Sequence, residues 1–166
     1  MDYVDLQYVQ KEQKGYLVMA DEFDFWNDHS REYLSMAYMW DRRQELDNPD
    51  GSGKKTGDCG DTITMYLKVD NGVVEQLCFE LDGCINTSAC CNVVASMVEN
   101  QPVAAGWDIT PAEVIEYLGT LPEDHHHCAE LAVGTFYLCL ADYEKRVSPS
   151  DPGEGKESRD KNLGTD

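Results

Sequence analysis

Three cysteines stand where the chain is expected to pass from a loop into a regular element. Cys59 lies in the glycine-flanked loop GDCGD, Cys84 in the short link DGC, and Cys128 at the end of a histidine run. Such junctions can converge at one end of a small sheet. Convergent thiolates suit zinc or iron–sulfur clusters, so these three thiols predict a metal or cluster site.

Oxygen and nitrogen ligands are available beside two of these cysteines. Asp61 follows Cys59 by two residues and could add a carboxylate, and His127 directly precedes Cys128 and could add an imidazole. Three sulfurs with one oxygen or nitrogen would hold a cluster less firmly than four cysteines do. That weaker hold suits a protein that must give its cluster away.

The histidine run PEDHHHCAE raises the question of how many imidazoles could bind. Consecutive side chains on one backbone cannot easily point at the same ion, so at most one of His125 and His126 should join His127. We expect His125 and His126 to be exposed, or to contact the ligands without binding the metal themselves. A histidine-rich tract indicates metal only by composition, so the run alone decides nothing.

The junctions at Cys84 and Cys128 are predicted helix starts, which favour the thiolate form by lowering its pKa. Four further cysteines lie inside predicted elements, where we expect them to pack as small apolar residues: Cys78, Cys90, Cys91 and Cys139.

Two alternatives stay open for the junction cysteines. One is a zinc site for structure or sulfur acceptance; the other is a thiol enzyme with Cys128 as nucleophile and His127 as base. Adjacent residues at a helix start rarely face each other and nothing marks an oxyanion hole, so we do not expect an enzyme.

An antiparallel hairpin is the clearest element that would position these residues. TITMYLKV (62–69) alternates between apolar and polar side chains, DNG (70–72) is a hairpin turn signal, and VVEQLCFEL (73–81) is the return strand. The strand ends three residues before Cys84. The hairpin therefore leads directly into one of the candidate ligands.

Three helices are predicted after the hairpin: Asn86 to Asn100, a short helix opened by the capping box TPAE (110–113), and His126 to Arg146. The apolar side chains of the last helix are expected in the core: Leu131, Phe136, Leu138 and Leu140. A hairpin followed by helices predicts an α+β fold. We expect a small antiparallel sheet, the hairpin 62–81 with a third strand, packed against several helices.

The chain divides into three parts that differ in composition. Residues 1–56 are charged and aromatic, and we expect a helical segment that packs on the core, with an amphipathic helix from Ser30 to Leu46. NPDGSGKKTGD (48–58) has the composition of a flexible loop. Residues 57–147 would form the core, and residues 148–166, almost without apolar side chains, a disordered acidic tail.

Composition limits the compartment and the partners. Lys+Arg 13 against Asp+Glu 32 gives a net charge of -19, which argues against nucleic acid and anionic membranes as partners. No apolar run reaches about 18 residues, and the start lacks the features of a signal peptide. Seven cysteines, an odd number, argue against a secreted disulfide framework. We therefore expect a cytoplasmic protein with reduced thiols.

With these elements in place, the chain resembles the iron–sulfur cluster assembly scaffolds of the IscU type, equivalent to the N-terminal domain of NifU. The matching stretches are CGD (59–61), LKVDNGVVEQLCFELDGC (67–84), the helix after it, HC (127–128) and LADYEKR (140–146). The spacings between the three junction cysteines, 25 and 44 residues, are close to those of the family. The resemblance implies a SufE/IscU-like fold.

The resemblance also implies a function. Such a scaffold binds iron and builds a [2Fe–2S] cluster with sulfur from a cysteine desulfurase, then passes the cluster to recipient apoproteins. By position, Cys59, Cys84 and Cys128 match the family's cluster cysteines, Asp61 the aspartate associated with cluster lability, and His127 the histidine beside the last cysteine. The resemblance further implies that Cys128 receives persulfide sulfur, and that zinc binds the cluster-free form.

One stretch departs from the family pattern. Typical members read LPPVKIHC before the last cysteine, whereas this chain has LPEDHHHC (121–128), with His125 in place of the lysine. In typical members that stretch is recognised by an Hsp70-type chaperone, so LPEDH weakens the expectation of this partner. The first 56 residues also lack the family's N-terminal motif, which marks a divergent member.

Overall fold

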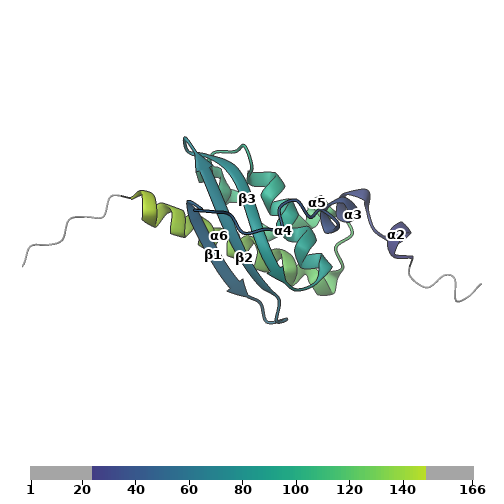
Figure 1. The fold of residues 1–166 in the computed structure, drawn as a ribbon. Coiled ribbons are helices and arrows are strands. Elements are labelled where there is room, and N and C mark those ends of the chain that lie inside the picture. The colour runs from purple at the N-terminus through teal and green to yellow at the C-terminus, as the bar shows by residue number, and fades with distance from the viewer. Residues whose placement is uncertain (1–23, 149–166) are drawn as a thin grey trace, which may run out of the picture.

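A computed structural model of the protein describes residues 24–148, which form a three-stranded antiparallel sheet with helices packed against it (Figure 1). The strands are β1 (Gly51–Thr56), β2 (Thr62–Asp70) and β3 (Val73–Asp82), in the order β1-β2-β3. This confirms the predicted α+β class and the third strand. The predicted acidic tail lies outside the described residues, apart from Ser148.

The β2–β3 hairpin confirms the alternating pattern. Ile63, Met65 and Leu67 on β2 are fully buried, because their side chains all point to the face covered by helices. The turn residues Asn71 and Gly72 both have positive φ angles, 48° and 79°. Asparagine and glycine tolerate this conformation, which two-residue hairpin turns require.

The prediction of a flexible loop over residues 48–58 is wrong, because most of that stretch is β1. The strand pairs with β2 from Gly51 to Thr56. A Cβ atom on Gly51 would lie 2.5 Å from the carbonyl oxygen of Cys139, and one on Gly53 only 2.8 Å from the Cys139 amide nitrogen. The glycines are thus required for the close approach of the last helix, and they replace the apolar side chains of an ordinary strand.

The predicted helices after the hairpin are confirmed with small shifts at their ends. They are α4 (Ile85–Val98), α5 (Pro111–Leu118) and α6 (His126–Val147), with 3-10 turns at Val103–Asp108 and Glu123–His125. Helix α4 is buried along most of its length, because it lies between β3 and the helices α3, α5 and α6. Both halves of the predicted capping box of α5 form, between the Thr110 and Glu113 side chains and the reciprocal backbone groups.

The apolar face of α6 is narrower than predicted. Leu131, Phe136 and Leu140 are buried in the core, as expected, whereas Leu138 is 44% exposed. Leu138 packs its Cβ near Gly53 of β1, at the border of the sheet, and the rest of its side chain points outward. The prediction that Leu138 belongs to the core is therefore wrong.

The N-terminal helix is shorter than the predicted span from Ser30 to Leu46. Helices α2 (Phe25–Asp28) and α3 (Arg31–Ala37) are present, and no helix follows before β1. The side-chain amide of Asn92 on α4 donates hydrogen bonds to the carbonyl oxygens of Met36 and Met39, at 2.9 and 3.0 Å. These carbonyls are thereby bound to α4 at the point where the chain leaves the helix.

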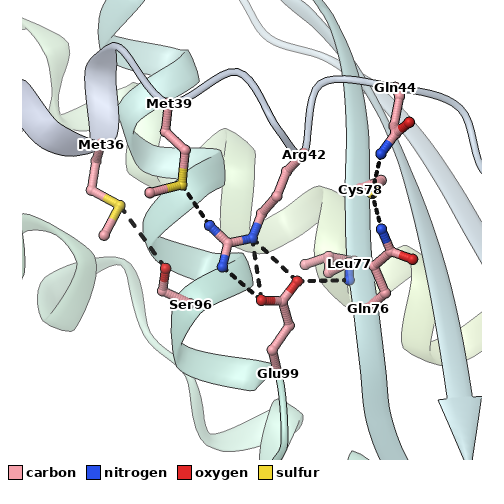
Figure 2. Close-up of polar contacts among 9 residues, drawn as sticks. All are labelled: Met36, Met39, Arg42, Gln44, Gln76, Leu77, Cys78, Ser96 and Glu99. Carbon is pink, nitrogen blue, oxygen red and sulfur yellow. Dashed lines mark hydrogen bonds and ion pairs between the residues drawn. The ribbon is translucent and has the colours of Figure 1, made fainter.

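The segment between α3 and β1 is instead fastened along the outer edge of β3 (Figure 2). Arg42 makes a two-pronged ion pair with Glu99 at the end of α4, with a shortest distance of 2.6 Å. Glu99 also accepts a hydrogen bond from the Leu77 amide at 3.2 Å, and the Phe79 amide donates to the Arg42 carbonyl at 2.9 Å. Edge amides that would otherwise be open to a foreign strand are thus satisfied.

Candidate metal centre

Two helix N-termini bring two of the predicted cysteines together. Cys84 is the N-cap residue of α4, directly after β3, and Cys128 lies in the first turn of α6. Because α4 and α6 pack against each other, their first turns meet and the two Sγ atoms lie 3.9 Å apart. The thiol of Cys84 is half-buried and that of Cys128 is fully buried.

Two imidazoles flank the buried thiol of Cys128. The Nδ1 atom of His125 lies 3.8 Å from its sulfur, and the Nε2 atom of His127 lies 3.6 Å from it. Ligand atoms of Cys84, His125 and Cys128 all lie within 4.8 Å of one another, close enough to share one metal ion. His125 is therefore nearer to the candidate ligands than we expected from the sequence, and His126 is half-buried and makes no such contact.

Cys59 stands apart from this group. It is exposed in the turn between β1 and β2, beside Gly60, which has a φ angle of 92°. Cys59 and His127 both line a shallow recess, together with Lys55 and Leu131. The structure thus brings Cys84 and Cys128 together and places Cys59 on the neighbouring wall with His127.

Asp61 holds the start of α4. Its Oδ2 atom accepts hydrogen bonds from the amide of Cys84 at 3.1 Å and from the hydroxyl of Thr87 at 2.6 Å. A Cβ atom on Gly83 would lie 2.6 Å from the Asp61 carboxyl carbon, so only glycine leaves room for this approach. Thr87 was not predicted as a site residue, although its hydroxyl stands three residues after the junction cysteine Cys84.

The ionisation of these groups follows from burial and hydrogen bonding. Burial of Cys128 raises its pKa to about 12, and the neighbouring Cys84 adds to this effect. The expectation that the helix start lowers the pKa of Cys128 is therefore wrong. Burial alone would raise the pKa of Asp61, but the hydrogen bonds from Thr87 and Cys84 outweigh it and lower that pKa. Metal binding would have to displace a proton from Cys128.

The donor set fits borderline metals. The two thiols and the imidazole of His125 lie within 4.8 Å of one another, and the imidazole of His127 lies 3.6 Å from the sulfur of Cys128. Thiolates and imidazoles are the ligands that zinc and iron–sulfur centres use, whereas hard cations such as Mg²⁺ prefer oxygen. In residues 24–148, no helix has both the length and the apolar character needed to span a membrane. The fold and the site together define a small α+β protein with thiols and imidazoles gathered at one end of a sheet.

The family described as NifU-like N terminal domain matches residues 44–149, well over half of the chain, and the protein therefore belongs to this family. This confirms the resemblance expected from the sequence. The iron–sulfur cluster assembly scaffold protein IscU 1 of Archaeoglobus fulgidus is 29% identical over 108 residues, which cover 64% of this chain and 71% of that protein. The IscU scaffold of Aquifex aeolicus is 31% identical over 87 residues, covering 51% of this chain and 55% of the relative. The relatives are scaffolds by name, in agreement with the expectation of a non-enzymatic protein.

Solved structures share the fold. The N-terminal NifU-like protein from Brucella abortus has a TM-score of 0.58 at 20% identity, over 70% of this chain and 94% of that one. A putative SUF-system scaffold from Fervidobacterium islandicum has a TM-score of 0.56 at 15% identity, over 70% of this chain and 99% of that one. The predicted IscU-like architecture is thereby confirmed.

Proposed function

We propose that this protein is a scaffold on which an iron–sulfur cluster is assembled and from which it is passed on. A [2Fe–2S] cluster would be held by Cys59, Cys84 and Cys128, with Asp61 or His127 as a further ligand. The observation that carries the proposal is the approach of the Cys84 and Cys128 thiols to 3.9 Å, at two helix N-termini, in a chain of this family. Helix N-termini also favour the negative charge of a thiolate-bound cluster.

The position of Cys59 supports a cluster that is built and released. Its exposed turn includes Gly60, and Cys59 lines the same recess as His127. A ligand on a glycine-containing turn can approach and leave an ion with little rearrangement of the sheet. Cys128, in contrast, is fixed in the first turn of a long helix. We infer that Cys128 and Cys84 anchor the cargo and that Cys59 completes the site.

Partners follow from the same proposal. Assembly needs a source of sulfur, for which we propose a cysteine desulfurase with Cys128 as the sulfur acceptor, and release needs recipient apoproteins. The acidic character of the chain, with a net charge of -19, favours partners with basic surfaces. The stretch LPEDH (121–125) gives no support for an Hsp70-type chaperone.

Zinc binding is a second candidate function for the same residues. The observation that favours it is the compact group of Cys84, His125 and Cys128, whose donor atoms lie within 4.8 Å of one another. Two thiolates and an imidazole are frequent zinc ligands. Zinc would then occupy the site either as a structural ion or while the protein accepts sulfur.

Anaerobic reconstitution with ferrous iron and sulfide tests the proposal. The full chain should develop visible absorption from a cluster, and Cys84→Ser and Cys128→Ser should lose most of it, since each removes an anchoring thiolate. Cys78→Ser is the matched control, because Cys78 lies on β3, bonded to Gln44 and Gln76 at the outer edge of the sheet. Circular dichroism shows whether each variant is folded. Equal cluster content in all three variants would refute the proposal.

A further inference from the structure

We propose that His125 is a metal ligand in this chain and that, with Cys84 and Cys128, it forms a site for a divalent ion such as zinc. In this site Asp61 supports the start of α4 and does not contact the ion. The inference rests on the proposed function, because it names the ligand set of the same centre. It concerns a position where the family pattern has lysine.

The distances match those of a tetrahedral zinc site before the ion binds. With Zn–S near 2.3 Å and Zn–N near 2.0–2.1 Å, tetrahedral angles separate two sulfurs by about 3.8 Å and a sulfur from a nitrogen by about 3.6 Å. The observed separations are 3.9 Å between the Cys84 and Cys128 sulfurs and 3.8 Å between Cys128 Sγ and His125 Nδ1. The third separation, between the Cys84 sulfur and a ring nitrogen of His125, is within 4.8 Å and would shorten to about 3.6 Å when an ion binds.

The backbone explains why His125 and Cys128 meet. His125 is the N-cap residue of α6, and Cys128 is the third residue of that helix. Side chains at these two positions lie next to each other, as they do in a capping box. Neither His125 nor Cys84, the N-cap residue of α4, uses its side chain to cap its helix. Both donors are therefore available to an ion.

The second nitrogen of His125 lies on the side of an exposed carboxylate, beyond hydrogen-bond distance. While Nδ1 faces the Cys128 sulfur, Nε2 lies 3.9 Å from the carboxylate Oδ2 of Asp124. Metal-binding histidines commonly direct their other N–H at a carboxylate, which orients the ring and makes it a better ligand. Because Nδ1 faces the Cys128 sulfur, it is the atom that we expect to bind, and a small movement of Asp124 would bring its carboxylate to Nε2.

Asp61 is engaged elsewhere. Its Oδ2 atom accepts hydrogen bonds from the Cys84 amide and the Thr87 hydroxyl, and its carboxyl group packs on Gly83. Moving this oxygen onto an ion would leave both donors without an acceptor, at a cost of about 1–3 kcal/mol each. His125 offers an alternative ligand that gives up no hydrogen bond in its helix.

Titration of the metal-free full chain with Co²⁺, whose visible bands report tetrahedral thiolate coordination, tests this inference. The unaltered chain should bind one Co²⁺. His125→Ala should weaken binding by about 100-fold, because loss of even an outer-sphere partner weakens metal sites by about 10- to 100-fold. His126→Ala is the matched control, one residue away in the same run, and should stay within about threefold.

The outcomes separate this inference from the proposed function. If His125→Ala binds Co²⁺ as well as His126→Ala does, His125 is not the ligand and the inference is overturned. Cluster reconstitution can still succeed in that case. If the unaltered chain binds neither Co²⁺ nor iron with sulfide, both fail. X-ray absorption of the zinc-loaded chain should show one imidazole fewer in His125→Ala, and thermal unfolding in chelator identifies any variant that is merely destabilised.

Discussion

At the scale of single residues, a helix N-terminus and burial have opposite effects on the pKa of Cys128. A helix N-terminus stabilises a thiolate by about 0.3–1 kcal/mol, less than the roughly 1.4 kcal/mol that moves a pKa by one unit. Complete burial beside a second thiol acts in the other direction and is larger, so the pKa of Cys128 rises to about 12. The thiol is therefore held protonated at neutral pH until an ion displaces its proton.

Thr87 gives a prediction at this scale. Its buried hydroxyl donates to Asp61 at 2.6 Å and lies 3.4 Å from the sulfur of Cys84. Thr87→Val keeps the shape of the side chain but removes the donor, and should lower the free energy of unfolding by about 1.5–3 kcal/mol. Urea denaturation in chelator measures the change. Thr64→Val, at a half-exposed position on β2, should change it by less than about 0.5 kcal/mol, and equal effects would contradict the supporting role of Thr87.

The site residues differ in how far sequence could predict them. Cys84 and Cys128 could be placed at one end of the sheet, because each adjoins a predicted element. The proximity of His125 was not predicted, although the start of the last helix at His126 was, because it depends on the 3-10 turn Glu123–His125, which places His125 as the N-cap residue beside Cys128. Membership of Cys59, Asp61 and His127 in the ligand set stays a prediction.

At the scale of elements, the hairpin and α4–α6 could be predicted because each carries its own pattern: alternation, a turn signal or a capping box. Strand β1 could not, since its sequence GSGKKT carries no apolar alternation. Its role is to let α6 approach, and that requirement exists only in the assembled fold. The prediction of a long N-terminal helix was wrong for a related reason. Asn92 binds the carbonyl oxygen of Met36 and Glu99 binds the side chain of Arg42, and both partners lie far along the chain.

The Arg42–Glu99 pair gives a prediction at this scale. Both side chains are about four-fifths buried, and the carboxylate of Glu99 raises the pKa of Arg42 through its hydrogen bonds. Arg42→Ala would leave a buried carboxylate without its counter-charge, and partial solvent access reduces the penalty to about 2–3 kcal/mol of unfolding free energy. Chemical denaturation measures it, with Arg31→Ala, an exposed position, as control. If the two variants are equally stable, the pair does not fasten the segment before β1.

At the scale of the whole molecule, the acidic character of the chain extends to the neighbourhood of the site. The chain has a net charge of -19, and the recess beside Cys59 and His127 is lined by Asp58 and Glu130 as well as by Lys55. Acidic residues elsewhere keep the protein apart from other acidic macromolecules. The surface thus favours basic partner proteins, while the centre has donors for a soft or borderline metal.

The content of iron, zinc and acid-labile sulfide in the full chain, isolated under anaerobic conditions, tests the central claim most directly. A cluster scaffold should contain iron and sulfide in about equal amounts, near two of each per occupied site, as in a [2Fe–2S] cluster. Anaerobic reconstitution should raise both together. Zinc alone, at about one ion per chain and with no sulfide even after reconstitution, would contradict the claim and favour the zinc-binding alternative.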